Sequence, residues 1–185
     1  MRSLVVVLFL AATVAAEDKK PEPVKNESLI RLLTKLKTSK NRAETLKDFA
    51  KANRLDPETE AFVAKLKPNE AASYSTSVDT YLKAKRLPEA KAALDVTEAI
   101  CHENAQALDR GTGYFGAAFM ADDFKQLADW RLALGQKGDA RDLYVRAVDC
   151  YRRQQHYHIA QGQPKANEAV LKEIYDTLDR IRSDK

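Results

Sequence analysis

Apolar residues recur at helical spacing along most of the chain, and short polar breaks separate one run from the next. The clearest run is Leu29, Ile30, Leu32, Leu33 and Leu36. Spacings of three and four residues place apolar side chains on one face of an α-helix, whereas a strand would alternate. No stretch shows convincing alternation. We therefore predict an all-α fold.

The breaks between the runs indicate where the helices begin and end. Asp56-Pro57 is typical of a helix start, because Asp caps the free N–H groups and Pro lacks an N–H that would need a partner there. We predict further starts at Pro68-Asn69-Glu70 and Leu87-Pro88, a helix capped by Asp139, and a last helix over 167–182. A weaker stripe lies at Ala43, Leu46, Phe49 and Ala50, and a long segment runs from 115 to 134.

The first 16 residues differ from the rest of the chain. Arg2 precedes the apolar run 4–10, and small residues come before the charged stretch that starts at Glu17. This is the pattern of a secretory signal peptide, and it is too short for a membrane anchor. We predict a signal peptide over 1–16, a disordered lead-in over 17–26 and one helical domain over 27–185, in a secreted or periplasmic protein. We expect no stable membrane insertion after cleavage. Asn26-Glu27-Ser28 matches a glycosylation acceptor, which matters only in a eukaryotic host.

The charges argue against nucleic acid as a partner. The chain has 31 Lys and Arg against 27 Asp and Glu, a net charge of +4, and the two signs alternate without a basic block. Nucleic-acid binding proteins concentrate basic residues on one face. We therefore expect no nucleic acid.

Three glycines, Gly111-x-Gly113-x-x-Gly116, match the fingerprint of dinucleotide-binding enzymes. That fingerprint needs a β-strand before the first glycine, so that the loop delivers phosphate to a helix start. Residues 98–108 favour a helix instead. The better interpretation is that Gly111 ends one helix, Thr112 helps to start the next, and Gly116 permits close helix packing.

One stretch carries the pattern of a helical repeat: Phe124-x-x-Leu127-Ala128-x-x-Arg131, Leu134-Gly135, then Ala140-x-x-x-Tyr144-x-x-Ala147. It resembles the tetratricopeptide repeat, in which small residues let two antiparallel helices approach and large ones fill the gaps. Weaker copies begin at Tyr74 and Leu29, and Thr45, Ala90 and Ala140 each lie sixteen residues after the first large residue. The resemblance implies antiparallel helical hairpins stacked as a solenoid.

The chain also departs from that family. The copies begin about 45 and 50 residues apart, whereas the family repeats every 34. Ser77 replaces a Leu, Arg131 replaces an aromatic residue and Thr45 replaces an Ala. A compact antiparallel helical bundle therefore stays open as the alternative fold.

Cys101 and Cys150 are the two cysteines of the chain. Disulfides persist outside the cytosol, and both residues fall late in the second helix of adjacent predicted pairs. We therefore predict a Cys101–Cys150 disulfide. The alternative is two buried thiols, since free Cys behaves as a small hydrophobic residue.

Residue patterns typical of catalysis or metal binding are missing. His156 and His158 would point about 200° apart on a helix, and His102 brings no convergent set of zinc ligands. Neither a Gly-x-Ser-x-Gly nor a His-Glu-x-x-His is present. We predict no catalytic residue, no metal site and no cofactor.

The predicted function is an exported adaptor that binds a protein or peptide without catalysis. In stacked repeats the first helices line the groove, which would place Tyr74, Tyr81, Lys83, Lys85, Lys125, Asp129 and Arg131 near a bound peptide. Aromatic residues are typical of interface centres, so Tyr114 and Phe115 with Phe119 and Met120 join the candidates, although they also suit a core. The alternatives are a secreted bundle that carries a small ligand or metal, and an enzyme without a recognisable motif. The sequence does not indicate the oligomeric state.

Overall fold

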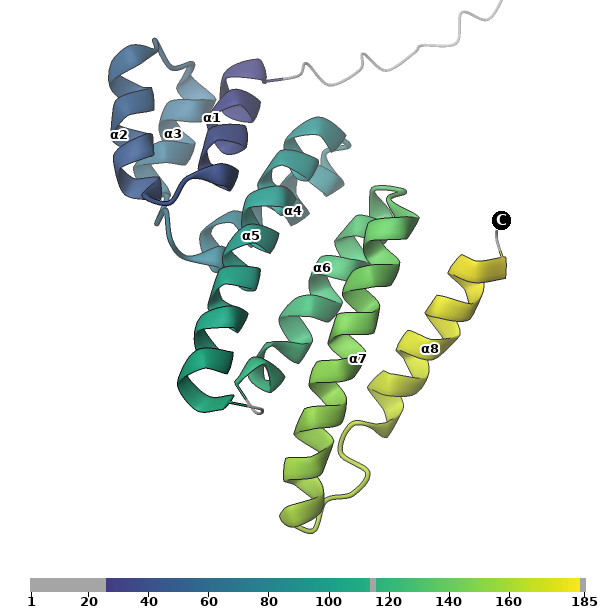
Figure 1. Cartoon of the computed structure of the whole chain (residues 1–185). Helices are drawn as coiled ribbons and strands as arrows, with labels where there is room; N and C mark the ends of the chain where they lie inside the picture. The colour runs from purple at the N-terminus through teal and green to yellow at the C-terminus, as the bar shows by residue number, and fades with distance from the viewer. Residues whose placement is uncertain (1–25, 114–115, 184–185) are drawn as a thin grey trace, which may run out of the picture.

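The computed structural model describes residues 26–113 and 116–183, and every regular element in those ranges is helical. The predicted signal peptide and residues 17–25 lie outside the described residues. Figure 1 shows the helices, whose bounds are α1 Glu27–Thr38, α2 Arg42–Ala52, α3 Pro57–Lys65, α4 Ala71–Lys83, α5 Leu87–Thr112, the 3-10 helix η2 Ala117–Met120, α6 Ala121–Ala133, α7 Lys137–Ala160 and α8 Glu168–Ser183. The all-α prediction is confirmed for this part of the chain.

The longest helices lie side by side in the order in which they occur in the sequence. α4 packs along α5, α6 packs along α7, and α8 adds to the far side of α7 (Figure 1). At the other end of the molecule α1 packs on α5, and α2 and α3 lie beyond α1. The core therefore extends through successive layers of helices.

The α4–α5 and α6–α7 pairs share one backbone pattern at an offset of 50 residues. α4 and α6 are each 13 residues long and begin at Ala71 and Ala121. In the turn between α4 and α5 the N–H of Arg86 donates to the Tyr81 carbonyl at 2.9 Å. In the turn between α6 and α7 the N–H of Gln136 donates to the Arg131 carbonyl, also at 2.9 Å. Both are Schellman turns, which leave the intervening residue in the left-handed conformation. Lys85 has φ 58° and Gly135 has φ 73°.

Buried side chains repeat at the same offset. Tyr74 and Phe124 are each fully buried on the first helix of their pair, and Ala90 and Ala140 are each fully buried on the second. A methyl side chain at the start of the second helix lets the two backbones approach. Ile174, also fully buried, continues the series on α8.

The N-terminal helices are held differently. Leu29, Leu32, Leu33 and Leu36 of α1 are completely buried, as their spacing predicts. On α2 Phe49 is buried and Leu46 is partly buried against the core, but Ala43 and Ala50 are exposed, so half of the predicted stripe was wrong. The buried residue that sequence reasoning missed is Arg42.

Arg42 links α2 to α5 through an ion pair. It is 4% exposed, its Nε donates to the Leu36 carbonyl at 3.1 Å, and its two terminal nitrogens contact the Glu103 carboxylate at 2.8 and 2.7 Å. A bidentate pair of this kind fixes orientation as well as distance. The hydrogen bonds to Glu103 raise the pKa of Arg42 despite its burial and lower the pKa of Glu103.

The helix starts were predicted unevenly. Asp56 caps α3 as predicted, accepting the N–H groups of Glu58 and Thr59. Asp139 is not a cap, because α7 begins two residues earlier at Lys137. Asn26 does not belong to a disordered lead-in: it caps α1, and its side-chain amide donates to Asp56 at 3.0 Å. That nitrogen, the atom a glycan would take, is occupied inside the fold.

The glycine segment is a helix end with a close approach. α5 continues through Gly111 and Thr112 and ends at Gly113, which has φ 68°, so the assignment of the end to Gly111 was wrong. Gly116 allows close packing as predicted, since a Cβ there would lie 2.3 Å from the Leu108 carbonyl oxygen. No strand precedes these glycines among the described residues.

Candidate binding groove between α4 and α6

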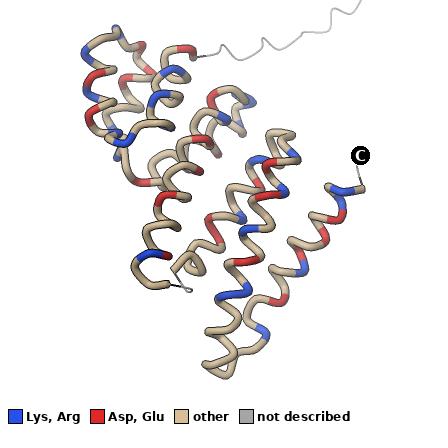
Figure 2. The backbone as a smooth tube through the Cα atoms, viewed as in Figure 1, with Lys and Arg blue, Asp and Glu red and all other residues tan. Residues whose placement is uncertain are grey.

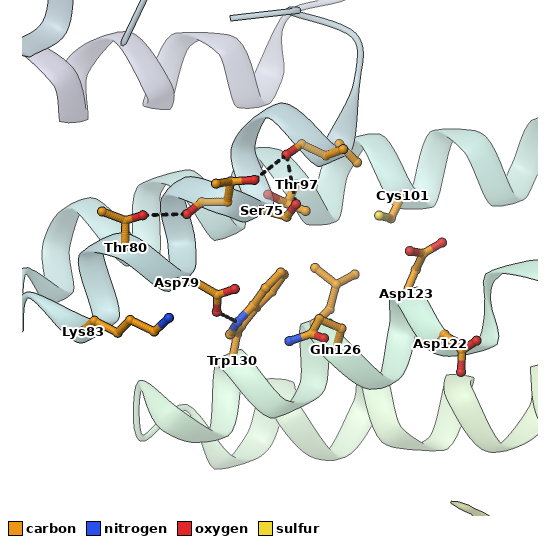
Figure 3. A pocket seen from close by; sticks show the side chains of 14 residues that line it. Ser75, Asp79, Thr80, Lys83, Thr97, Cys101, Asp122, Asp123, Gln126 and Trp130 are labelled. Atoms are coloured by element: carbon orange, nitrogen blue, oxygen red, sulfur yellow. Dashed lines mark hydrogen bonds between the residues drawn. The ribbon is translucent and has the colours of Figure 1, made fainter. Parts of the chain in front are cut away.

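A groove of about 540 Å³ lies between the first helices of the two repeated pairs. α4 and α6 form its walls and α5 its floor. Figure 3 shows it from close by. The lining residues are Ala71, Ala72, Ser75, Thr76, Asp79, Thr80, Lys83, Thr97, Cys101, Asp122, Asp123, Gln126, Leu127 and Trp130.

Small side chains on α4 leave the space that makes the groove. The hydroxyl of Thr76 donates to the Ala72 carbonyl at 3.3 Å, and that of Thr80 donates to the Thr76 carbonyl at 2.8 Å. Hydroxyls that bond to their own helix present mainly methyl groups to the groove. The α4 wall is therefore small and without charge until Asp79.

A single hydrogen bond joins the two walls. Nε1 of Trp130 on α6 donates to Oδ1 of Asp79 on α4 at 2.8 Å, and Figure 3 shows the indole pointing toward α4. Trp130 is 7% exposed, so its N–H needs a partner inside the structure. The contact fixes the spacing of the walls at this end of the groove.

The floor comes from α5. Thr97 and Cys101 are each 3% exposed, and the Thr97 hydroxyl donates to the Ala93 carbonyl. Burial, with smaller contributions from the Asp123 and Glu98 charges, raises the pKa of Cys101 to about 12. The thiol therefore stays protonated at neutral pH, which does not suit a nucleophile.

Two aspartates begin the α6 wall at the other end. The Asp122 carboxylate accepts the hydroxyl of Tyr151 on α7. Asp123 turns toward the Cys101 side of the groove (Figure 3). Burial, and then the neighbouring charge of Asp122, raise the pKa of Asp123.

Most of the predicted partner-binding residues belong to the helix packing. Tyr74 is completely buried and its hydroxyl donates to the Pro68 carbonyl at 2.9 Å. Tyr81 is 7% exposed, with the Arg86 guanidinium 5.0 Å from its ring centre. Burial raises the pKa of each tyrosine to about 12. Neither side chain lines the groove.

The predicted lysines have separate positions. Lys85 is exposed at the α4–α5 turn. Lys125 is half-buried, with its Nζ 3.0 Å from both Asp129 and Glu173, so it joins α6 to α8. Lys83 is the one residue of the predicted groove set that lines the α4–α6 groove.

Arg131 is a buried connector between the two pairs. It is 5% exposed and contacts Asp95 at 2.7 Å and Glu98 at 2.6 Å, both on α5, while its other nitrogen donates to Gln136. Burial alone would lower the pKa of Arg131, but the two carboxylates raise it overall. Arg131 is therefore a packing residue and not an exposed contact for a partner.

The remaining candidates, three aromatic residues and one methionine, do not share one environment. Tyr114 and Phe115 lie outside the described residues. Met120 is 6% exposed and belongs to the core, whereas Phe119 is 74% exposed.

The predicted disulfide is not confirmed. Cys101 and Cys150 are both buried and both carry free thiols. Cys101 lines the groove, and Cys150 lines a different hollow with Asp109 and Ala117. Burial raises the pKa of Cys150 to about 11. The two thiols fit the alternative of small buried side chains.

Within residues 26–113 and 116–183 no three His, Cys, Asp or Glu side chains gather where they could hold a metal ion. His102 lies 3.6 Å from Glu98, away from the groove floor.

In the same ranges no helix combines the length and hydrophobicity needed to cross a bilayer. Figure 2 shows acidic and basic residues interspersed along the chain.

No family model matches this chain, and comparisons with curated proteins and with solved structures give no match either.

Sequence reasoning missed Trp130 and Asp79, whose hydrogen bond defines the groove. The available signal was the predicted correspondence between residues 74 and 124. Tyr74 and Phe124 occupy the same position of their pairs, so α4 and α6 are the two first helices, and their exposed faces are the ones that meet across a gap.

Proposed function

We propose that this chain is an exported, non-catalytic module that binds a segment of another protein in the α4–α6 groove. The observation that carries the proposal is the groove itself, which lies between corresponding helices of two pairs repeated at an offset of 50 residues. Repeated helical pairs commonly use such an extended surface for binding.

The matching turns support a tetratricopeptide-like solenoid rather than a bundle. Neighbouring pairs add to one another through the contacts of α5 with α6, and α8 extends the series from α7. A bundle would enclose a single core, whereas stacked pairs leave a surface between their first helices. The 50-residue period, longer than the family's, agrees with the long second helices α5 and α7.

The chemistry of the groove favours binding over catalysis. Its thiol is protonated and buried, and its hydroxyls bond to their own helices. Neither arrangement provides an activated nucleophile, which needs an adjacent base or a lowered pKa. The amino-terminal pattern over 1–16 supports a periplasmic or extracellular location.

The proposal is tested by filling the groove. Thr76→Arg puts a long side chain at an exposed position of α4 where Arg is a good helix former. Thr34→Arg is the matched control, because Thr34 is an exposed helical threonine whose hydroxyl also bonds four residues back, at 2.8 Å.

The measurement is capture of crosslinked partners by tagged protein in its native compartment. We expect wild type and Thr34→Arg to capture the same protein and Thr76→Arg to lose it. Equal capture by all three variants would contradict the groove as the binding site. Copurification of a small molecule that Thr76→Arg displaces would instead support the ligand-carrying alternative.

A further inference from the structure

The groove carries an excess of negative charge. Three of its lining residues are the aspartates Asp79, Asp122 and Asp123, and Lys83 is its one basic residue. Asp79 accepts a hydrogen bond from Trp130, and Asp122 accepts one from Tyr151. Among the described residues no hydrogen bond or ion pair reaches the Asp123 carboxylate.

A second unpartnered polar group lies beside Asp123. The Cys101 thiol is 3% exposed, lines the groove floor, and has no hydrogen bond to any described residue. Figure 3 shows Cys101 and Asp123 pointing toward each other from α5 and α6. This end of the groove therefore offers a carboxylate and a sulfur acceptor to something that donates hydrogen bonds.

A cation on a flexible side chain suits this end better than a bare metal ion. No three ligand side chains are placed to hold a metal within the described residues. An ammonium or guanidinium group needs fewer acceptors, and its methylene chain needs an apolar surface beside it. The exposed side chains of Ala72 and Thr76 provide methyl groups for that surface on the α4 wall, since the Thr76 hydroxyl bonds to its own helix.

We propose that the segment bound in the groove places a Lys or Arg side chain there, with the cationic end beside Asp123 and the methylenes along Ala72 and Thr76. This inference rests on the proposed function. The occupant is thus a basic stretch of a partner protein, and Asp123 is the residue that selects it. Because Asp123 is partly exposed to solvent, its loss is expected to weaken binding about tenfold rather than abolish it.

The chain's one tryptophan makes the test direct. The indole N–H signal of Trp130 in a ¹H–¹⁵N spectrum reports occupancy of the groove. The probes are blocked Gly-Ser hexapeptides with a central Arg, Lys, Leu or Glu. We expect the Arg and Lys peptides to shift the Trp130 signal and the Leu and Glu peptides to leave it unchanged.

The variants are Asp123→Asn and the control Asp48→Asn, an exposed aspartate on α2. Asp123→Asn should bind the Arg peptide about tenfold more weakly, and Asp48→Asn should match wild type. Equal shifts from all four peptides, no shift from any, or full binding by Asp123→Asn would each overturn the inference.

Failure here is distinguishable from failure of the proposed function. If the groove binds a partner through other contacts, Thr76→Arg still abolishes capture while Asp123→Asn captures as wild type does. That result would overturn the cationic contact and keep the groove. If Thr76→Arg captures normally, both proposals fall.

Discussion

The α4–α5 and α6–α7 pairs share a backbone and differ in what their matching residues do. Tyr81 and Arg131 occupy the same position before the turn, and each contributes the carbonyl that closes it. Tyr81 contacts Arg86 within its own helix pair. Arg131 instead forms ion pairs with Asp95 and Glu98 on α5, which belongs to the preceding pair.

The comparison separates two kinds of information in the sequence. The turns and the small residues at Ala90 and Ala140 specify the shape of a pair. Residues such as Arg131 specify which pair stacks on which. The first kind tolerates substitutions of similar size, while the second depends on a particular charged partner.

The largest loss of stability is expected from substituting Arg131. Arg131→Met leaves the Asp95 and Glu98 carboxylates without their principal cation, and losing one partner of a buried ion pair costs on the order of 3 kcal/mol. The control is Lys125→Met on the same helix, a more exposed pair that contributes under about 1 kcal/mol. Denaturant unfolding of both variants measures the difference. Equal losses would show that Arg131 does not join the pairs.

A smaller effect, equal in the two pairs, is expected at the buried alanines. Ala90→Leu and Ala140→Leu each force a larger side chain between two helices, at a cost of about 1–3 kcal/mol. Both residues are completely buried. Unfolding free energies that differ widely between the two variants would argue against a common packing geometry.

Exchanging the residues at the two turns should change the stability of the protein in opposite directions. Lys85→Gly relieves a left-handed conformation and is expected to stabilise the protein by about 1 kcal/mol, while Gly135→Lys destabilises it by about the same amount. The two changes exchange the residues of equivalent positions. Thermal unfolding measures both, and a stabilised Gly135→Lys protein would refute the equivalence.

The smallest effect concerns pH. Burial on its own would raise the pKa of Asp95 and of Glu98. The pKa of Asp95 is lowered overall by Arg131 with Lys91 and Lys37, and that of Glu98 by His102 and Arg131. A lowered folded pKa gives stability that is present above the unfolded pKa, near 4, and is lost as pH falls through the folded pKa. The stability gap between wild type and Arg131→Met should therefore narrow from pH 5 downward. Unfolding curves across that range would contradict this if the gap widened.

Local patterns in the sequence predicted much of the fold. Asp56 as a cap, the leucines of α1 and the close approach at Gly116 all follow from chemistry within a few residues. Positions decided by distant contacts were not predictable in this way. Arg42 is buried because it pairs with Glu103 on α5, and Arg131 because it pairs with Asp95 and Glu98 on the same helix. No local sequence pattern predicts these long-range ion pairs.

The candidate site was predicted less well than the fold, for the same physical reason. Large aromatic residues such as Tyr74 and Tyr81 suit a binding surface by type, but their size makes them fill the space between helices. The groove exists where side chains are small, at positions such as Ala72 and Thr76, which give no signal by themselves.

The most direct test of the account is a photocrosslinking residue placed in the groove. Substituted at Gln126, an exposed residue of the α6 wall, it should join the protein to one partner in the native compartment, and the same residue at Thr34 should not. Adding Thr76→Arg to the Gln126 variant should remove the adduct. Identical adducts from Gln126 and Thr34, or an adduct that persists with Thr76→Arg, would contradict the α4–α6 groove as the binding surface.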